Sequence, residues 1–353
     1  MRLHKLRVEN FRRIQKREIS LLGPDGSPRP LTVIVGPNMS GKTTLLDALH
    51  LAYEAIAHAR NPRWRPEFHP DDPTLRPDPN QPIVISVEFS LHEGEYEALS
   101  TLESALGSSF DVARAAVYSF EFSWPPPATS HHGVTRSNPH HAQLAFQGRA
   151  LASMALKRKV TTEKCLDDIG AVVYLDQNRY GRLLDDAPKL DMSSALKERV
   201  TPKDVLGWFV RASILDEKWE PETQGESQWR RVKRLFADLA APAAIDDMKP
   251  SDDGYDLRLI RDGGYYYSGG MSSGERQILR LAANLVYVRA VRSIVLIDEL
   301  ELNLHPRWQR SLLRFCQTGG DDDNQFIITT HSETMLRYVD PNAVIILEDL
   351  DGA

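Results

Sequence analysis

The sequence is poor in cysteine and has no long apolar run. Its 353 residues include two cysteines. Cys165 and Cys316 lie too far apart to match a zinc-binding or redox motif, which fits a reducing compartment. No apolar segment approaches the ~20 residues that a membrane-spanning helix requires, and charged residues begin at Arg2. We therefore expect a cytoplasmic protein with no membrane partner.

The sequence also lacks an excess of positive charge. Its 43 Lys and Arg residues are outnumbered by 49 Asp and Glu residues, a formal net charge of −6. No overall field attracts nucleic acid, so any DNA contact must come from a local patch. No heptad pattern persists for several turns, which excludes a long coiled-coil arm. The 41% hydrophobic content is enough for a large core, in one domain with insertions or in two domains.

Residues 36–43, Gly-Pro-Asn-Met-Ser-Gly-Lys-Thr, fit the phosphate-binding pattern G-x-x-x-x-G-K-[ST]. A β-branched run at 31–35 precedes them and apolar residues at helical spacing follow, which predicts a strand, a loop and a helix. This arrangement directs backbone N–H groups and the positive helix end at one point, where phosphates would bind. The alternative is an ordinary glycine turn. The residues expected to contact ATP are Gly36, Pro37, Asn38, Met39, Ser40, Gly41, Lys42, Thr43 and Thr44.

Four residues near this loop have more specific expected roles. Lys42 would reach the β- and γ-phosphates, and the Thr43 hydroxyl would ligate Mg²⁺. Arg12 and Arg13 lie in the basic segment 1–22, whose alternating pattern predicts two strands. These two arginines either occupy solvated strand faces or lie against the nucleotide base or phosphates.

The middle of the chain contains two irregular stretches around a pair of strands. Residues 60–82 carry seven prolines, which excludes a continuous helix and predicts an exposed insertion. Residues 83–91 and 115–124 predict antiparallel strands of a second sheet. Residues 125–141 hold four histidines without a cysteine or nearby carboxylate, so they form either a metal site or a mobile polar loop. The four histidines are His131, His132, His140 and His141.

A buried strand at 171–175 precedes two candidates for sensing Mg²⁺ and the attacking water. Gln177 is one, and its neighbour Asn178 fits almost as well. Residues 195–245 then predict helices, one of which has a basic face. That face either meets a phosphate backbone or is the solvated side of an amphipathic helix. Its residues are Arg230, Arg231, Lys233 and Arg234.

The last hundred residues add further candidates in a fixed order. After a hairpin at 255–267, Ser272 and Gly274 open a helix and leave a hydroxyl and backbone free to approach an anion; the alternative is a simple helix cap. A buried strand then ends in Asp298, placed to hold Mg²⁺ through water, and Glu299, placed to polarise the attacking water. A later buried strand ends at His331, which could donate a hydrogen bond to a γ-phosphate oxygen.

Taken in order, these motifs resemble an ABC-type ATPase head. Walker A lies at 36–43, the signature loop at 271–275, Walker B at 294–299 and the switch histidine at His331. The similarity covers about 1–57 and 255–348, and the region between matches only in general layout.

Within that group the chain resembles the RecF-like and OLD (overcoming lysogenisation defect) family rather than transporter subunits. The sequences that carry this resemblance are Glu-Leu-Glu-Leu-Asn-Leu-His-Pro at 299–306, Ile-Thr-Thr-His-Ser at 328–332 and Asn-Phe-Arg at 10–12. Two features depart from the pattern. Ser273 and Glu275 stand where transporters usually have Gly and Gln, and we expect no Toprim nuclease domain of the OLD type.

The resemblance implies an α/β P-loop NTPase of ABC-ATPase type. Its mostly parallel core sheet would be joined by an antiparallel β subdomain and a helical lobe that carries the signature. We expect residues 1–180 to hold the P-loop and the antiparallel subdomain. Residues 181–270 would form the helical lobe, and residues 271–353 would contain the signature helix, Walker B and the switch histidine.

The resemblance also implies that two heads enclose two ATP molecules and Mg²⁺, each site combining one chain's P-loop with the other chain's signature. Signature contacts would come from Ser272, Gly274 and Glu275, catalytic groups would be Lys42, Glu299 and His331, and metal contacts would come from Thr43, Asp298 and Gln177.

Hydrolysis would switch this homodimer between closed and open states. The leading function is an ATPase in DNA repair or anti-phage defence, acting with a separate effector such as a nuclease and with DNA contact left open. The alternative is a nucleotide-gated protein scaffold with little turnover and no direct DNA contact. A transporter ATPase is disfavoured by the His305–Pro306 element and the long insertion.

Overall fold

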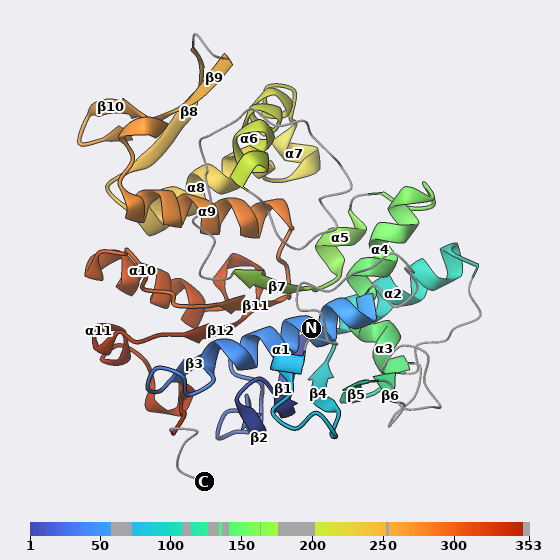
Figure 1. Cartoon of the computed structure of the whole chain (residues 1–353). Coiled ribbons are helices and arrows are strands. Elements are labelled where there is room, and N and C mark those ends of the chain that lie inside the picture. The colour runs from blue at the N-terminus through green and yellow to red at the C-terminus, as the bar shows by residue number, and fades with distance from the viewer. Residues whose placement is uncertain are drawn as a thin grey trace.

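The structure is a computed structural model that describes residues 1–57, 73–107, 114–125, 134–135, 141–162, 164–175, 202–251 and 254–348. These residues form three β-sheets with helices packed between and around them (Figure 1). In the described part of the chain, no helix combines the length and the apolar character needed to cross a membrane.

A parallel five-stranded sheet lies at the centre, in the order β13-β3-β12-β11-β7. It confirms the mostly parallel core sheet expected from the sequence. Because its strands run in one direction, the loops that follow β3, β11 and β12 leave the same edge, where α/β proteins bind ligands. The strands are β3 (Leu31–Val35), β7 (Val172–Leu175), β11 (Ile294–Ile297), β12 (Gln325–Thr329) and β13 (Val344–Ile346).

Both faces of this sheet are buried, which explains why its strands are almost wholly apolar. Successive side chains point to opposite faces, so Val295 and Ile297 enter one core while Ile294 and Leu296 enter the other. Each such buried side chain contributes about 1.5–3 kcal/mol. One face is covered by α6 (Pro202–Asp216), α8 (Gln228–Ala240), α9 (Ser273–Tyr287) and α10 (Pro306–Gln317).

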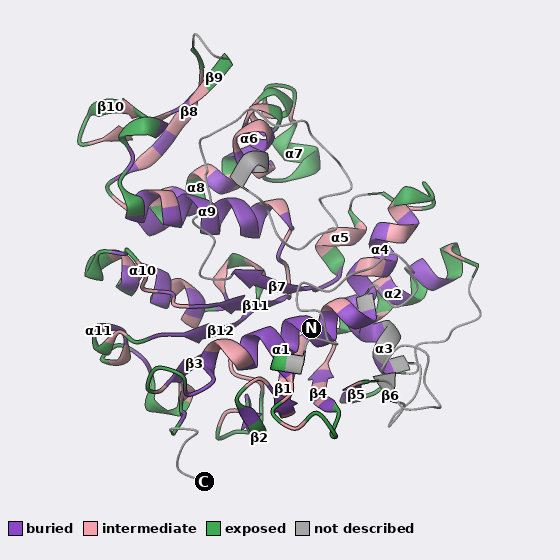
Figure 2. Cartoon of the chain, in the orientation of Figure 1, coloured by how far each residue is buried: buried purple, intermediate pink, exposed green. Residues whose placement is uncertain are grey.

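The opposite face is covered by α1 (Lys42–Ala57) and then by the antiparallel sheet, so α1 lies between two sheets (Figures 1 and 2). This second sheet has the order β2-β1-β4-β5-β6. The N-terminal strands and the strands predicted at 83–91 and 115–124 therefore belong to one sheet. Its members are β1 (Arg2–Phe11), β2 (Ile14–Ser20), β4 (Ile83–Ser90), β5 (Tyr118–Trp124) and β6 (Val134–Thr135).

Four further helices were not predicted. They are α2 (Glu93–Ala105), α3 (His141–Phe146), α4 (Gly148–Lys157) and α5 (Cys165–Asp168). Of the insertion predicted at 60–82, residues 60–72 lie outside the described residues, and most of the side chains at 74–82 are exposed, as predicted. There Leu75 is buried, and the Asn10 side chain donates to the carbonyls of Asp78 and Gln81 at 2.8 and 2.7 Å. This end of the insertion is therefore fastened to β1.

The region predicted as a helical lobe contains a third sheet. The hairpin predicted at 255–267 is present as β9 (Gly254–Arg261) and β10 (Gly264–Tyr267). It is joined by β8 (Ala244–Ser251), and the sheet projects from the body in Figure 1. The sequence of β8 contains two Asp, one Lys and one Pro, a poor strand composition, so pairing with β9 rather than local propensity forms it. The remaining short helices are α7 (Pro221–Gln224) and α11 (Glu333–Leu336).

Candidate nucleotide-binding and catalytic site

The loop 36–41 is a tight turn from β3 into α1. A Cβ at Gly36 would lie 2.6 Å from the Leu347 carbonyl oxygen and 2.7 Å from Ser40 Oγ, so only glycine fits there. Met39 has a positive φ of 67° and its side chain is 69% exposed. The loop follows β3 directly and α1 begins at Lys42, as the sequence predicted.

Lys42 folds back over this loop. Its Nζ donates to the carbonyl oxygens of Gly36 at 2.9 Å and Pro37 at 2.7 Å. Burial lowers the Lys42 pKa from its ordinary value, and the nearby acids, Asp298 first, offset part of that effect. The lysine nitrogen is therefore already directed at the position where a phosphate would bind to the loop.

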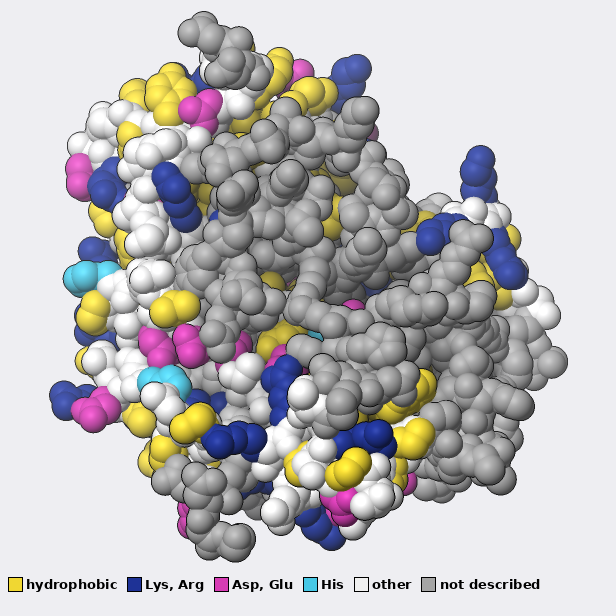
Figure 3. Space-filling model, in the orientation of Figure 1, with side chains coloured by type: hydrophobic (Ala, Val, Ile, Leu, Met, Phe, Trp, Pro, Cys, Tyr) yellow, Lys and Arg dark blue, Asp and Glu magenta, His cyan; other side chains and the backbone are white. Residues whose placement is uncertain are grey.

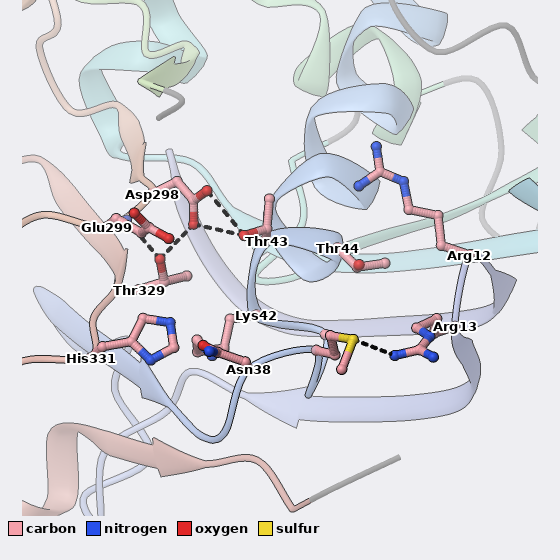
Figure 4. A pocket seen from close by; sticks show the side chains of 12 residues that line it. Arg12, Arg13, Asn38, Lys42, Thr43, Thr44, Asp298, Glu299, Thr329 and His331 are labelled. Carbon is pink, nitrogen blue, oxygen red and sulfur yellow. Dashed lines mark hydrogen bonds between the residues drawn. The ribbon is translucent and has the colours of Figure 1, made fainter. Parts of the chain in front are cut away.

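The acids that follow β11 meet the start of α1 and the end of β12 (Figure 4). Thr43 Oγ1 donates to both carboxylate oxygens of the fully buried Asp298, each at 3.0 Å. Thr329 Oγ1 donates to Asp298 Oδ1 at 2.6 Å and accepts the Glu299 backbone N–H at 2.8 Å. The sequence analysis did not assign Thr329, whose contacts with these acids follow from the pairing of β12 beside β11.

A cavity of about 370 Å³ lies where these groups meet. It brings together the predicted Walker A, Walker B and switch-histidine stretches, together with the two N-terminal arginines. Its lining residues are Arg12, Arg13, Asn38, Met39, Gly41, Lys42, Thr43, Thr44, Asp298, Glu299, Thr329 and His331.

Both predicted arginines line the cavity, which favours a nucleotide contact over a plain solvated face. Arg12 Nη1 contacts Asp47 Oδ2 at 2.5 Å, and Tyr174 donates to the other Asp47 oxygen at 2.8 Å. Burial raises the Asp47 pKa, and the contacts with Arg12 and Tyr174 oppose that rise. Arg13 Nη1 lies 2.9 Å from the sulfur of Met39. Asp47 was not among the predicted residues, although it stands four residues after Thr43 on the same side of α1.

His331 lines the same cavity with an exposed side chain. Its backbone N–H donates to Glu301 Oε1 at 2.6 Å, which joins the loop after β11 to the loop after β12. After Thr329 and Asp47, Glu301 is a third residue that the sequence analysis did not assign, and it contacts the site through His331.

The signature residues lie outside this cavity, at the start of α9 beside β10 (Figure 1). Ser272 caps the helix by accepting the Glu275 N–H at 3.2 Å, and Glu275 Oε2 accepts the Ser272 N–H at 2.8 Å. Glu275 is buried, and Tyr266 donates to its other oxygen at 2.5 Å. Burial works against the charged form of Glu275, but the hydrogen bonds from Tyr266 and Ser272 outweigh it, so its pKa is lowered.

Within one chain, Gly274 and Glu275 have structural contacts, and their predicted contact with ATP across a dimer stays a prediction. Gly274 is buried, and its Cα packs against the Trp308 ring. Glu275 is held inside the helix cap, where it fixes the shape of the loop. Ser272 remains exposed at the surface.

We expect Gly274→Ala to lower the free energy of unfolding by about 1–3 kcal/mol, the usual cost of overpacking. The added Cβ would lie 2.8 Å from the Trp308 ring and 2.9 Å from the Asn303 carbonyl oxygen. The cost of this overpacking exceeds the stabilisation of up to about 1 kcal/mol that alanine gives over glycine in a helix. Urea denaturation measures the change, with the exposed Ser273→Ala as the control; equal stability of Gly274→Ala and wild type would contradict the packing account.

Several predictions fall outside the described residues. Gln177 and Asn178, the two candidates for sensing the metal, are among them, so that assignment stays a prediction. His131, His132 and His140 of the second insertion are also outside the described part, and His141 begins α3.

The basic face of α8 is occupied by ion pairs within the chain. Arg230 pairs with Asp216 at 3.0 Å, and Arg231 pairs with Asp322. Arg234 pairs with both Glu226, at 2.8 Å, and Asp321, at 2.5 Å. Figure 3 likewise shows basic and acidic side chains interspersed over the described part of one face of the molecule. These contacts favour the solvated-face alternative for α8 over a DNA-binding one.

Two family models match the chain. One, described as "AAA domain", matches residues 5–197. The other, described as "AAA domain, putative AbiEii toxin, Type IV TA system", matches residues 173–337.

Curated relatives are similar over shorter stretches. "Retron Vc95 probable ATPase" from Vibrio cholerae serotype O1 biovar El Tor is 29% identical over 119 residues, 30% of this chain and 23% of its own length. "Retron Ec83 probable ATPase" from Escherichia coli is 33% identical over 90 residues, 22% of this chain and 16% of its own length. "Septu protein PtuA" from Bacillus mycoides (strain KBAB4) is 33% identical over 87 residues, 22% of this chain and 12% of its own length. The chain thus matches less than a quarter of each relative.

Solved structures of SMC heads share the fold over nearly the whole chain. An SMC head bound to the C-winged helix domain of ScpA gives a TM-score of 0.52 at 17% identity, covering 98% of this chain and 94% of that one. An Smc head with an extended coiled coil, bound to the C-terminal domain of ScpA derived from Pyrococcus furiosus, gives 0.50 at 13% identity, covering 99% and 94%. The expected ABC-type ATPase head is therefore confirmed as the fold. Because the first family model spans more than half of its residues, the chain belongs to the AAA domain family of P-loop ATPases.

Proposed function

We propose that the chain binds ATP with Mg²⁺ in the cavity around Lys42 and hydrolyses it to ADP and phosphate. The observation that carries this proposal is the convergence of three distant stretches, 38–44, 298–299 and 329–331, on one cavity. Each stretch supplies a different requirement: a cation with backbone amides for the phosphates, carboxylates for a metal and a proton, and a histidine.

The residues around Asp298 fit a magnesium ion. Thr43 and Asp298 offer only oxygen atoms, the donors that Mg²⁺ prefers, and those oxygens lie 3.0 Å apart. When bound, Mg²⁺ would supply positive charge against the β- and γ-phosphate oxygens. The loop fits an anion as well, because the buried hydroxyl of Ser40 has no hydrogen-bond partner among the described residues.

In the proposed reaction, Glu299 accepts a proton from the attacking water as the water oxygen bonds to the γ-phosphorus. The bond from that phosphorus to the β–γ bridging oxygen breaks, and ADP leaves with that oxygen and its electron pair. Lys42 balances charge on the β- and γ-phosphates, and His331 donates a hydrogen bond to a γ-phosphate oxygen. A positioned general base contributes about 10²–10⁴-fold to such a step.

We propose further that two copies complete each site. The support is that the cavity has no lining residue from the signature loop of its own chain, while Ser272 and Ser273 are exposed at the start of α9. A second copy would bring the N-terminus of its α9 to the γ-phosphate side of the cavity. That helix end carries a partial positive charge and the exposed residues Ser272 and Ser273.

For the cellular role, we propose a cytoplasmic member of the RecF-like and OLD branch that switches a DNA-repair or anti-phage defence complex through a separate effector such as a nuclease. Similarity to the two retron ATPases and to PtuA supports defence. Both cysteines are free, as in a reducing compartment. The identity of the adjacent genes tests this proposal, and a nuclease gene there is the expected finding.

The alternative is a nucleotide-gated scaffold with little turnover and no direct DNA contact. The ion pairs of the α8 arginines favour the absence of direct DNA contact. Glu299 at the cavity instead favours real turnover of ATP. Stimulation of turnover by DNA would separate the two functions.

The shared-site proposal predicts that two inactive variants recover activity when mixed. A homodimer of Lys42→Ala, or of Ser272→Arg, has both of its sites broken. In a mixed dimer both lesions fall in one site, and the other combines an intact P-loop with an intact signature. Random mixing makes about half of the dimers mixed, so about a quarter of wild-type ATPase activity should return if the sites act independently.

Phosphate release after mixing measures this recovery, and each variant alone is the control. Strong coupling between the two sites would lower the recovered fraction. If two folded and exchanging variants recover nothing while the mixed dimer still binds ATP at one site, the two sites must act together. If the mixed dimer does not bind ATP at one site, the signature does not act across the dimer.

A further inference from the structure

Thr329 contacts both acids that follow β11. It is the last residue of β12, and its side chain is fully buried. Its hydroxyl has one proton to donate, and it donates that proton to Asp298 Oδ1 at 2.6 Å. The Thr329 hydroxyl oxygen in turn accepts the backbone N–H of Glu299 at 2.8 Å (Figure 4). One side chain thus holds both the carboxylate proposed for the metal and the backbone of the proposed base.

Glu299 needs such support because its backbone is strained. Its φ is 49°, in the left-handed region, which residues with a side chain adopt only when their surroundings enforce it. The Thr329 carbonyl oxygen also accepts the Leu300 N–H at 3.2 Å. The hydroxyl and the carbonyl of one threonine therefore hold two successive amides of the strained segment.

We propose that Thr329 is a positioning residue for hydrolysis. Its hydroxyl holds Glu299 in the conformation that directs the carboxylate at the attacking water, and it aligns Asp298 with Thr43. This inference rests on the proposed ATPase function. The phosphates are bound by the loop 36–43, which follows a different strand, so losing the Thr329 hydroxyl slows turnover much more than it weakens ATP binding.

The test is Thr329→Val, which keeps the β-branched shape and removes the hydroxyl. We expect kcat to fall about 10- to 100-fold, the scale of a misplaced catalytic group, with KM and ATP affinity changed less than about threefold. Thr329→Ser keeps the hydroxyl and should recover kcat to within about threefold of wild type.

The matched control is Thr32→Val in the neighbouring strand. Thr32 is also fully buried, but its hydroxyl has no hydrogen-bond partner among the described residues. Its replacement should leave kcat unchanged. A loss of turnover in Thr32→Val equal to that in Thr329→Val would overturn the proposal, because any buried hydroxyl in this sheet would then matter equally.

Hydrogen exchange at the Glu299 amide provides a readout that does not depend on turnover. This amide should exchange slowly in wild type and Thr329→Ser, and at least about tenfold faster in Thr329→Val. Fast exchange in folded wild type overturns the proposal even if Thr329→Val does not fold. If wild type hydrolyses ATP and Thr329→Val does so equally fast, Thr329 has no positioning role and the proposed function stands. If wild type shows no turnover, the proposed function fails, and the exchange rates alone decide whether Thr329 holds Glu299.

Discussion

Replacing Lys42 by alanine should abolish ATP binding. Lys42 is the lysine that lines the cavity, and its Nζ already lies over the loop, bonded to the carbonyls of Gly36 and Pro37. A hydrogen bond between charged groups is worth about 1.5–3 kcal/mol, so losing one to each of two phosphates costs about 3–6 kcal/mol. This corresponds to roughly 10²–10⁴-fold weaker binding.

Isothermal titration with ATP and Mg²⁺ measures this effect. Lys16→Ala is the matched control, because Lys16 is an exposed lysine of β2 paired with Glu9 at 3.1 Å. It should bind ATP as wild type does. The thermal midpoint of Lys42→Ala shows whether the protein remains folded, and ATP binding by folded Lys42→Ala with wild-type affinity would mean that the phosphates bind elsewhere.

Replacing Glu299 by glutamine should separate binding from hydrolysis. The amide keeps the size of the side chain, and the backbone N–H that bonds Thr329 is unchanged. It cannot accept the proton of the attacking water, so turnover should fall on the order of a hundredfold or more. ATP binding should persist, because Lys42 and the loop are intact.

The Glu299→Gln variant should therefore accumulate as an ATP-bound dimer. Sedimentation velocity with and without ATP measures the dimer, and Glu333→Gln, at the exposed first residue of α11, is the comparison for a change of charge outside the cavity lining. Normal turnover in Glu299→Gln would show that another group is the base.

The central features of the site could be predicted because they depend on local sequence. The loop around Lys42 and the strand ending at Asp298 are continuous motifs, and apolar runs such as 294–297 predict strands buried on both faces. The order of these motifs along the chain, with His331 last, predicted a parallel sheet whose strand ends meet at one edge.

What could not be predicted depends on contacts between distant segments. The contacts of Thr329 with the two acids follow from the pairing of β12 beside β11, and Asp47 is joined to Arg12, which is 35 residues away. The strand β8 forms because β9 pairs with it. The close packing of Gly274 against Trp308, which is 34 residues further along the chain, could not be predicted either.

Magnesium-dependent phosphate release by the purified wild-type chain tests the central claim most directly. The account predicts steady release of phosphate from ATP with Mg²⁺, loss of release when a chelator removes the metal, and a rate on the order of a hundredfold lower for Glu299→Gln prepared in parallel. No release by folded wild-type protein that binds ATP, or equal release by the Glu299→Gln preparation, would contradict it.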